Sequence, residues 1–182
     1  MRLLFLITVF FFLGKTTVFS QDKKITKTGS ITFEASVPSF EEVKATNNTV
    51  SCIIDTKTGD IASLALMRGF HFKVALMEEH FNENFVESSK YPKAIFKGKI
   101  KDFNLSKINT KGTKFDANGT LTLHGITKEI TIAVIVKKIE SNLVLNSDFI
   151  LSPEDFNISI PKIIKHKMAE KVQVHLDFLL KN

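Results

Sequence analysis

The chain of 182 residues contains no tryptophan, one tyrosine and one cysteine. The single cysteine, Cys52, excludes an internal disulfide and leaves no cysteine cluster for a structural zinc site. Arginine is nearly absent too, with Arg68 the only one after Arg2. Nucleic-acid binders typically gather arginines and stacking aromatics on one face, so no nucleic-acid partner is expected. The scarcity of Trp and Tyr also argues against the aromatic girdles of an outer-membrane barrel.

Residues 1–20 have the pattern of a secretory signal peptide. Arg2 is followed by an apolar run at 3–13 that only Thr8 interrupts, and Val18 and Ser20 precede a plausible cleavage site ahead of Gln21. The apolar run is too short to span a bilayer comfortably, although a retained membrane anchor is the alternative interpretation. The residue directly after the cleavage site is Gln21 rather than a cysteine, so we expect no lipoprotein anchor and a periplasmic or secreted protein.

Linkers are missing as well. The four prolines and eight glycines are scattered, so we expect residues 21–182 to form one domain with its own core.

Lysine and arginine together number 25 against 19 acidic residues, and the lysines are spread among the acids along most of the chain. This distribution is typical of a solvated surface.

The dominant pattern in the rest of the chain is an alternation of apolar and polar residues. A period of two indicates strands with one dry and one wet face. Turn sequences at 57–60, 109–112 and His124-Gly125 separate such segments, and short strands with short turns favour an antiparallel sandwich or barrel. We count about eight strands, at which number a closed barrel can just hold one small ligand. The clearest alternating segments are 31–36, 50–55, 94–101, 114–123 and 171–180.

One segment departs from this period. Met77, Phe81 and Phe85 are spaced four residues apart, which predicts a short amphipathic helix with a Phe stripe. The Tyr91-Pro92 pair ends any helix before it, because the residue preceding proline is pushed towards an extended conformation. We expect this helix to cap one opening of the barrel, and a second short helical turn at residues 152–155.

Two segments together closely resemble the YceI-like family of lipid- and polyisoprenoid-binding proteins. They are EHFNENFVESSKYPKAIFKG at residues 79–98 and GTLTLHGITKEI at residues 119–130. By this resemblance, the first is a cap region leading into a barrel strand and the second is a pair of barrel strands. Members are usually secreted to the bacterial periplasm and fold as lipocalin-like barrels that hold an extended isoprenoid or quinone-like lipid, with no known catalytic step. Many relatives carry a Trp and a His-Ser pair in the first strand, which this chain lacks at residues 28–33, so contacts made by that strand are not carried over.

The expected fold is therefore all-β, an antiparallel lipocalin-like β-barrel of about eight strands with a short capping helix. Its apolar face should point inwards, because the phenylalanines lie in mid-strand rather than in girdles at the strand ends. A bulky residue at Gly98 should then fill the lumen and weaken lipid uptake while leaving the barrel folded. The candidate lipid-binding residues of the lumen are Phe33, Phe72, Phe81, Phe85, Phe96, Gly98, Phe115, Leu121, Leu123 and Phe178.

Catalytic motifs find little support. His80 and Glu83 share the expected helix, but their spacing is not the His-Glu-x-x-His arrangement of zinc proteases. No Gly-x-Ser-x-Gly elbow or phosphate-binding glycine loop occurs. We expect no enzyme, no metal and no required cofactor, the bound group being an isoprenoid or quinone-like lipid. Cys52, in register with Val50 and Ile54, should be a small buried residue rather than a redox thiol.

A group of basic residues follows Pro161 in an expected loop. An ordinary solvated loop is the simpler interpretation. The alternative is contact with an anionic lipid head group or a transient contact with a membrane surface. The residues are Lys162, Lys165, His166, Lys167 and Lys171.

The leading hypothesis is a secreted barrel that sequesters or carries an apolar chain without transforming it. One alternative is a barrel filled by its own phenylalanines that acts as a surface interaction module. A less favoured one is a metal-dependent enzyme using His80 and Glu83 at the barrel mouth. An apolar tunnel distinguishes chains by only about 1–3 kcal/mol per methylene, so the sequence leaves the ligand's identity open.

Overall fold

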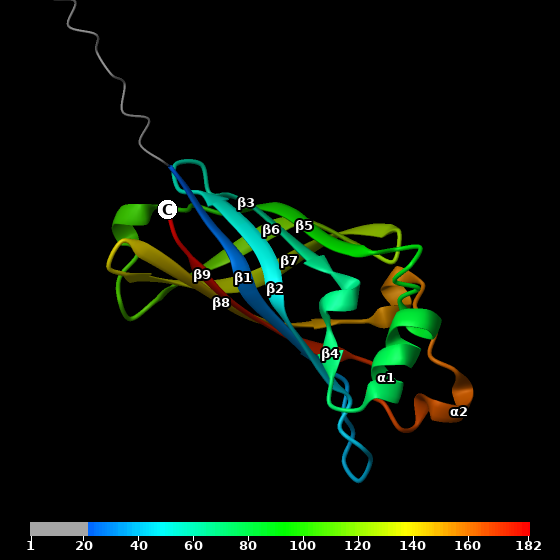
Figure 1. Cartoon of the computed structure of the whole chain (residues 1–182). Coiled ribbons are helices and arrows are strands. Elements are labelled where there is room, and N and C mark those ends of the chain that lie inside the picture. Colours follow the sequence, from blue (N-terminus) through cyan, green and yellow to red (C-terminus); the bar gives the residue numbers. More distant parts are fainter. Residues whose placement is uncertain (1–21) are drawn as a thin grey trace, which may run out of the picture.

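The computed structural model describes residues 22–182, and the expected signal peptide at 1–20 lies outside the described residues. Eight strands form one closed antiparallel barrel in the order β1-β9-β8-β7-β6-β5-β3-β2, and β2 pairs back with β1 (Figure 1). The two-residue strand β4 pairs with β2 on the edge opposite β1. The predicted fold class is confirmed. The strands are β1 Lys23–Glu34, β2 Lys44–Asp55, β3 Asp60–Leu66, β4 His71–Phe72, β5 Lys93–Ile100, β6 Thr113–Leu123, β7 Ile126–Ile139, β8 Asn142–Leu151 and β9 Val172–Leu180.

The alternation read from the sequence matches the burial of the strands. In β9, Val174, Leu176, Phe178 and Leu180 are buried, and the residues between them are exposed. Because successive side chains of a strand point to opposite faces, this strand presents one apolar face to the barrel interior. The inward apolar face predicted from the mid-strand phenylalanines is correct.

One end of the barrel is filled by its own side chains. Ile54, Ile100, Val136, Leu143 and Leu180 are fully buried there. Each such burial contributes about 1.5–3 kcal/mol to the stability of the fold. The first and last strands meet at this end, where the Ile25 and Lys181 backbones exchange hydrogen bonds of 2.7 and 2.9 Å (Figure 1). We call this the filled end.

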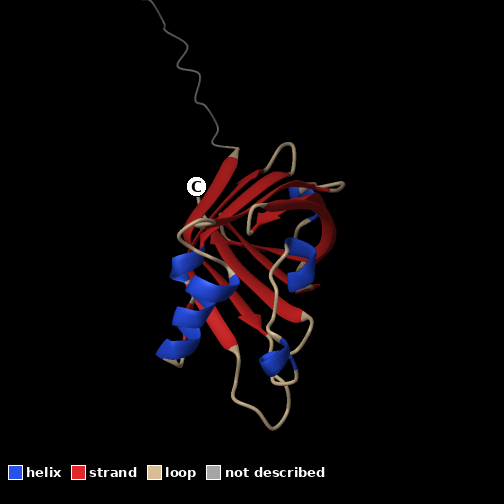
Figure 2. Cartoon of the chain, turned by 90° about the vertical axis from the view of Figure 1, so that its right-hand side faces the viewer, coloured by secondary structure: helices blue, strands red, loops and turns tan. Residues whose placement is uncertain are grey.

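Most helical segments lie at the opposite end (Figures 1 and 2), whereas the 3₁₀ turn at Leu105–Lys107 lies at the filled end (Figure 1). Helix α1, Ala75–His80, continues into the π-helical turn η2, Phe81–Phe85, so the predicted helix is present but changes hydrogen-bonding pattern halfway. The second predicted turn is the 3₁₀ helix η4, Pro153–Phe156. The basic segment expected as a loop contains a four-residue helix, α2, Lys162–Lys165. Two further 3₁₀ turns are η1, Met67–Gly69, and η3, Leu105–Lys107. Among residues 22–182, no helix is both long and apolar enough to cross a membrane.

Strands β7 and β8 separate towards the helical end. Their ladder covers only Ile135–Ile139 of β7 against Asn142–Asn146 of β8. The rest of β7 pairs with β6 alone, and the rest of β8 pairs with β9 alone. The barrel therefore widens towards this end.

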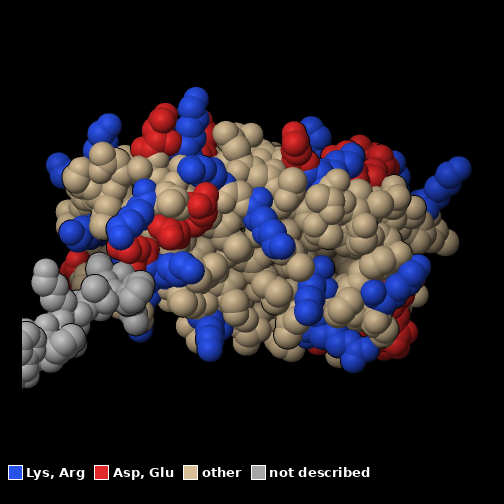
Figure 3. Space-filling model, turned by 90° about the horizontal axis from the view of Figure 1, so that it is seen from above, with Lys and Arg blue, Asp and Glu red and all other residues tan. Residues whose placement is uncertain are grey.

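Charged residues are mixed on the barrel surface. On the face seen from above, Lys and Arg side chains are interspersed with Asp and Glu (Figure 3). No continuous basic stripe runs across this face, as the charge distribution in the sequence predicts.

Candidate functional site

A cavity of about 510 Å³ occupies the barrel interior between the filled end and the helices. Ligand pockets of proteins typically measure about 300–1,000 Å³, so the space is large enough for a small molecule. Apolar residues of the strands supply most of its wall, among them Ile61, Ala117, Ile132 and Leu176. A cavity with such walls offers water few hydrogen-bond partners, which favours an apolar occupant.

Eight of the ten predicted lumen residues line this cavity. The two that do not are Gly98 and Phe115. The eight are Phe33, Phe72, Phe81, Phe85, Phe96, Leu121, Leu123 and Phe178.

Phe115 lies too close to the filled end of the barrel to reach the cavity. Strand β6 runs from the filled end at Thr113 towards the helical end at Leu123. The Phe115 ring packs on Phe103 in the connection before β6, with ring centroids 5.8 Å apart. It is therefore one of the side chains that pack the filled end.

Gly98 is a point of close approach between two strands. It lies directly opposite Gly119 in the β5–β6 ladder. A Cβ atom at Gly98 would lie 2.9 Å from the Gly119 Cα, 2.8 Å from the end of the Phe96 ring, and closer still to the Asn118 carbonyl oxygen. The expectation that a bulky residue here would fill the lumen and leave the barrel folded is wrong, because the added atoms would meet the backbone of β6.

Phenylalanine rings hold the cap against the barrel. The Phe81 ring of η2 contacts Phe33 of β1, Phe72 of β4 and Phe70, with centroids 5.3, 5.2 and 6.0 Å apart. Such pairs contribute about 0.5–1.5 kcal/mol each beyond the area they bury. The aromatic cluster thus forms part of the cavity wall on this side and ties the cap to two strands.

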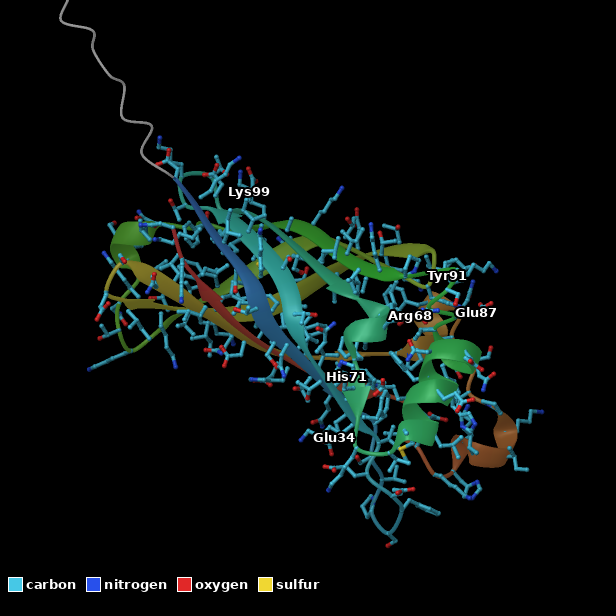
Figure 4. All side chains as sticks on the ribbon, viewed as in Figure 1. Glu34, Arg68, His71, Glu87, Tyr91 and Lys99 are labelled. Atoms are coloured by element: carbon cyan, nitrogen blue, oxygen red, sulfur yellow. The ribbon has the colours of Figure 1, made fainter. Side chains whose placement is uncertain are left out.

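Polar contacts anchor both ends of the α1–η2 segment. Near its start, the Glu78 carboxylate accepts a hydrogen bond of 3.0 Å from the Phe72 backbone N–H and lies 3.2 Å from Nδ1 of His71. Beyond its end, Glu87 Oε2 lies 2.8 Å from Nε2 of His124, whose Nδ1 is 3.0 Å from the Phe156 carbonyl oxygen. Figure 4 shows His71 on β4, and Glu87 near the top of the α1–η2 segment.

The His124 side chain therefore links three separate pieces of structure. It projects from the β6–β7 turn, where His124 and Gly125 have φ angles of 50° and 75°. A Cβ at Gly125 would lie 2.6 Å from the Tyr91 ring, and that ring also packs edge-on against His124 at 4.5 Å. The predicted turn at His124-Gly125, with glycine at a positive φ, is confirmed, and it also positions the segment after η2.

The polar side chains of the cavity lining are few and lie mainly in the cap. Glu41, His80, Ser152 and Lys167 come from segments outside the strands, and Ser63 comes from β3. A ligand with a polar end would find partners for that end near the cap, and almost none deeper inside.

The metal hypothesis gains no support from the geometry. His80 lines the apolar cavity, whereas Glu83 lines a separate, shallow polar hollow together with Arg68 and Asn82. Within residues 22–182, no group of three or more His, Cys, Asp or Glu side chains is placed to hold a metal ion.

Cys52 is a buried core residue of β2, as predicted. It is 2% exposed, and burial raises the pKa of its thiol to about 12 from an ordinary value of 9.0. A thiol with this pKa is protonated at neutral pH, which makes it a poor nucleophile.

Several lining residues were missed in the sequence. Ile130, Ile132 and Val134 of β7 lie in the nearly continuous apolar run 130–136, where alternation does not distinguish the inward face from the outward one. Phe156 had no alternation signal either, because its burial depends on the η4 turn folding inwards.

A closed antiparallel barrel with one filled end, an apolar internal cavity and a helical cap defines a lipocalin-like fold. The chain belongs to the YceI-like family, since the model of the YceI-like domain matches residues 12–180.

Among curated proteins, the chain is 34% identical over 95 residues to UPF0312 protein VPA0850 of Vibrio parahaemolyticus. The matched region is 52% of this chain and 41% of that relative, so it spans less than half of the relative's length.

Among solved structures, the fold is similar to a polyisoprenoid-binding domain from Saccharophagus degradans, with a TM-score of 0.76 and 13% identity over 88% of this chain and 98% of that one. It is also similar to BcnA of Burkholderia cenocepacia, with a TM-score of 0.68 and 16% identity over 84% and 96% of the two chains. At these identities, the likeness shows the shared fold.

Proposed function

We propose that the protein binds an extended apolar chain of the isoprenoid or quinone-like type in its barrel and sequesters or carries it without chemical conversion. The observation that carries this proposal is the 510 Å³ cavity, walled by apolar side chains and covered by an aromatic cap. Burying one methylene group contributes about 0.8 kcal/mol, so a short prenyl chain offers a large gross gain before the cost of ordering it. The polyisoprenoid-binding neighbour and the family membership support the same ligand class.

Two adjacent residues of β3 offer a matched test. Ser63 lines the cavity, and Ala62 beside it does not. Ser63→Phe should occupy part of the cavity, whereas Ala62→Phe places the same ring on the other face of the strand. The protein would be purified mildly, examined by native mass spectrometry, extracted with solvent, and then titrated with added geranylgeraniol.

We expect the unmodified protein and Ala62→Phe to carry and take up prenyl lipid, and Ser63→Phe to bind it at least about tenfold more weakly, a change of about 1.4 kcal/mol. Thermal unfolding of both variants controls for damage to the barrel. Empty protein that takes up no added lipid, or equal uptake by all three proteins, would refute the proposal.

We also propose that residues 1–20 are removed on export, so that the barrel acts in the periplasm or outside the cell. The sequence pattern at 1–20 supports this location. The mature protein isolated from its host should begin at Gln21 by intact-mass analysis. A chain that retains Met1, or one found only in the cytoplasmic fraction, would contradict it.

A further inference from the structure

The segment from Pro161 to Lys171, here called the basic lobe, exposes an apolar side chain at the helical end of the barrel. Ile163 of α2 is 79% exposed, the most exposed of the large hydrophobic side chains among the described residues. A single exposed apolar residue is ordinary on a protein surface. Ile163 is distinctive because Lys162 precedes it and Lys165 and Lys167 follow within four residues.

The basic lobe carries an excess of positive charge. Lys165 pairs with Glu154 and Glu170, with N–O distances of 3.5 and 3.1 Å. The other three lysines of the lobe form no ion pair with any residue of 22–182, and Glu170 is the lobe's only acidic residue. All three side chains are exposed, and Lys167 also borders the cavity, so Lys162 and Lys171 are available to meet an anionic surface.

The inner face of the same lobe borders the cavity. Ile164, Lys167 and Met168 line it, and the Ala169 backbone N–H donates a 2.8 Å hydrogen bond to the Ala35 carbonyl at the end of β1. Phe40 of the β1–β2 loop also lines the cavity, although it is 45% exposed.

The Phe40 ring packs edge-on against His166 of the lobe, with ring centroids 5.7 Å apart. Phe40 thus joins the lobe to the neighbouring loop. The exposed apolar surface and the cavity wall are therefore two sides of one layer of side chains.

We propose that the basic lobe, together with Phe40, docks this end of the barrel onto a membrane surface that carries anionic lipid head groups. This inference rests on the proposed function, because an apolar chain needs a route between bilayer and cavity. Lysines near an anionic leaflet each add several-fold to binding, and exposed apolar side chains can enter the head-group layer beside them. Docking of this end would let the ligand pass without exposing its full length to water.

The test is flotation of the full mature chain with vesicles of phosphatidylcholine, with or without phosphatidylglycerol. The variant K162Q/I163S changes two residues that do not line the cavity. The matched control K138Q/I139S alters the same pair of residue types on β7 at the filled end, where Ile139 is 49% exposed. We expect the protein to float with anionic vesicles and not with neutral ones, and added salt to release it. K162Q/I163S should lower the partition coefficient about tenfold, and the control should leave it unchanged.

Each failure has its own signature. Protein that binds geranylgeraniol in detergent solution but does not float with anionic vesicles overturns the docking proposal and leaves the proposed function standing. Equal flotation with neutral vesicles, or of K162Q/I163S and the unmodified chain, overturns the role of the basic lobe. Flotation without any uptake of prenyl lipid refutes the proposed function instead.

Discussion

Phe81 and Phe115 are a matched pair of positions for testing whether the barrel has a hollow part and a filled end. Both rings are half-buried and both pack on other phenylalanines, but only Phe81 lines the cavity. Phe81→Ala removes three ring contacts at 5.2 to 6.0 Å, and Phe115→Ala removes the contact with Phe103 at 5.8 Å. The two substitutions delete the same atoms from different ends of the barrel.

The expected losses of stability are similar, and the expected losses of binding differ. Truncating a fully buried Phe to Ala costs about 3–5 kcal/mol, so about 2 kcal/mol is expected for each of these half-buried rings. A lost contact of roughly 40 Å² between the Phe81 ring and an apolar ligand is worth about 1 kcal/mol, or about fivefold in Kd. Phe115→Ala should leave Kd unchanged.

Urea unfolding gives the stability of each variant, and displacement of an apolar fluorescent probe by geranylgeraniol gives Kd. Both variants should unfold at a lower urea concentration than the unmodified protein. Equal loss of affinity in the two variants, or full affinity in Phe81→Ala despite its lower stability, would refute the division of the barrel into a hollow and a filled end.

Three further predictions follow from other contacts. The Cys52 thiol, with its raised pKa of about 12, holds about a thousandfold less thiolate than a free thiol below pH 9, so native protein should resist alkylation that proceeds once urea unfolds it. Because burial raises the pKa of the folded thiol, only the unfolded chain loses the Cys52 proton as the pH rises above 9.0, and this favours unfolding. The free energy of unfolding should therefore fall by about 3 kcal/mol relative to that of Cys52→Ala by about pH 11 in urea titrations. Gly98→Ala should destabilise the barrel by about 1–3 kcal/mol, while Lys97→Ala on the outer face of the same strand should not, and an unchanged urea midpoint in Gly98→Ala would contradict the close strand approach. Glu78→Ala leaves the Phe72 N–H without its acceptor, so hydrogen exchange at that amide should accelerate well before global unfolding; unaltered exchange would show that the carboxylate does not anchor the cap.

The strands that alternate clearly were predictable, because alternation is a local signal. In β9, every second residue is apolar, and no other element is needed to decide which face is dry. The turn at His124-Gly125 was equally local, since it requires only residues that tolerate a positive φ angle. Both are properties of a few neighbouring residues.

The extent of the cavity could not be read in the same way. Phe115 and Leu121 lie on the same apolar face of β6, yet only Leu121 lines the cavity, because their height along the barrel axis decides the outcome. The space available at Gly98 depends on Gly119, the residue opposite it in the neighbouring strand, and the sequence alone does not reveal which residues are paired. His80 and Glu83 are three residues apart on one helical segment but face different hollows, because the segment changes to a π-helical turn between them.

The filled end of the barrel limits the routes by which a ligand could enter and leave. With Ile54, Ile100, Val136 and Leu143 blocking the far side, a long chain could enter only from the helical side and would have to back out along the same track. Its tail would arrive first and leave last, and its polar terminus would stay beside the cap throughout. Loading and delivery would then be the same movement run in opposite directions, and one molecule would have to depart before another could take its place.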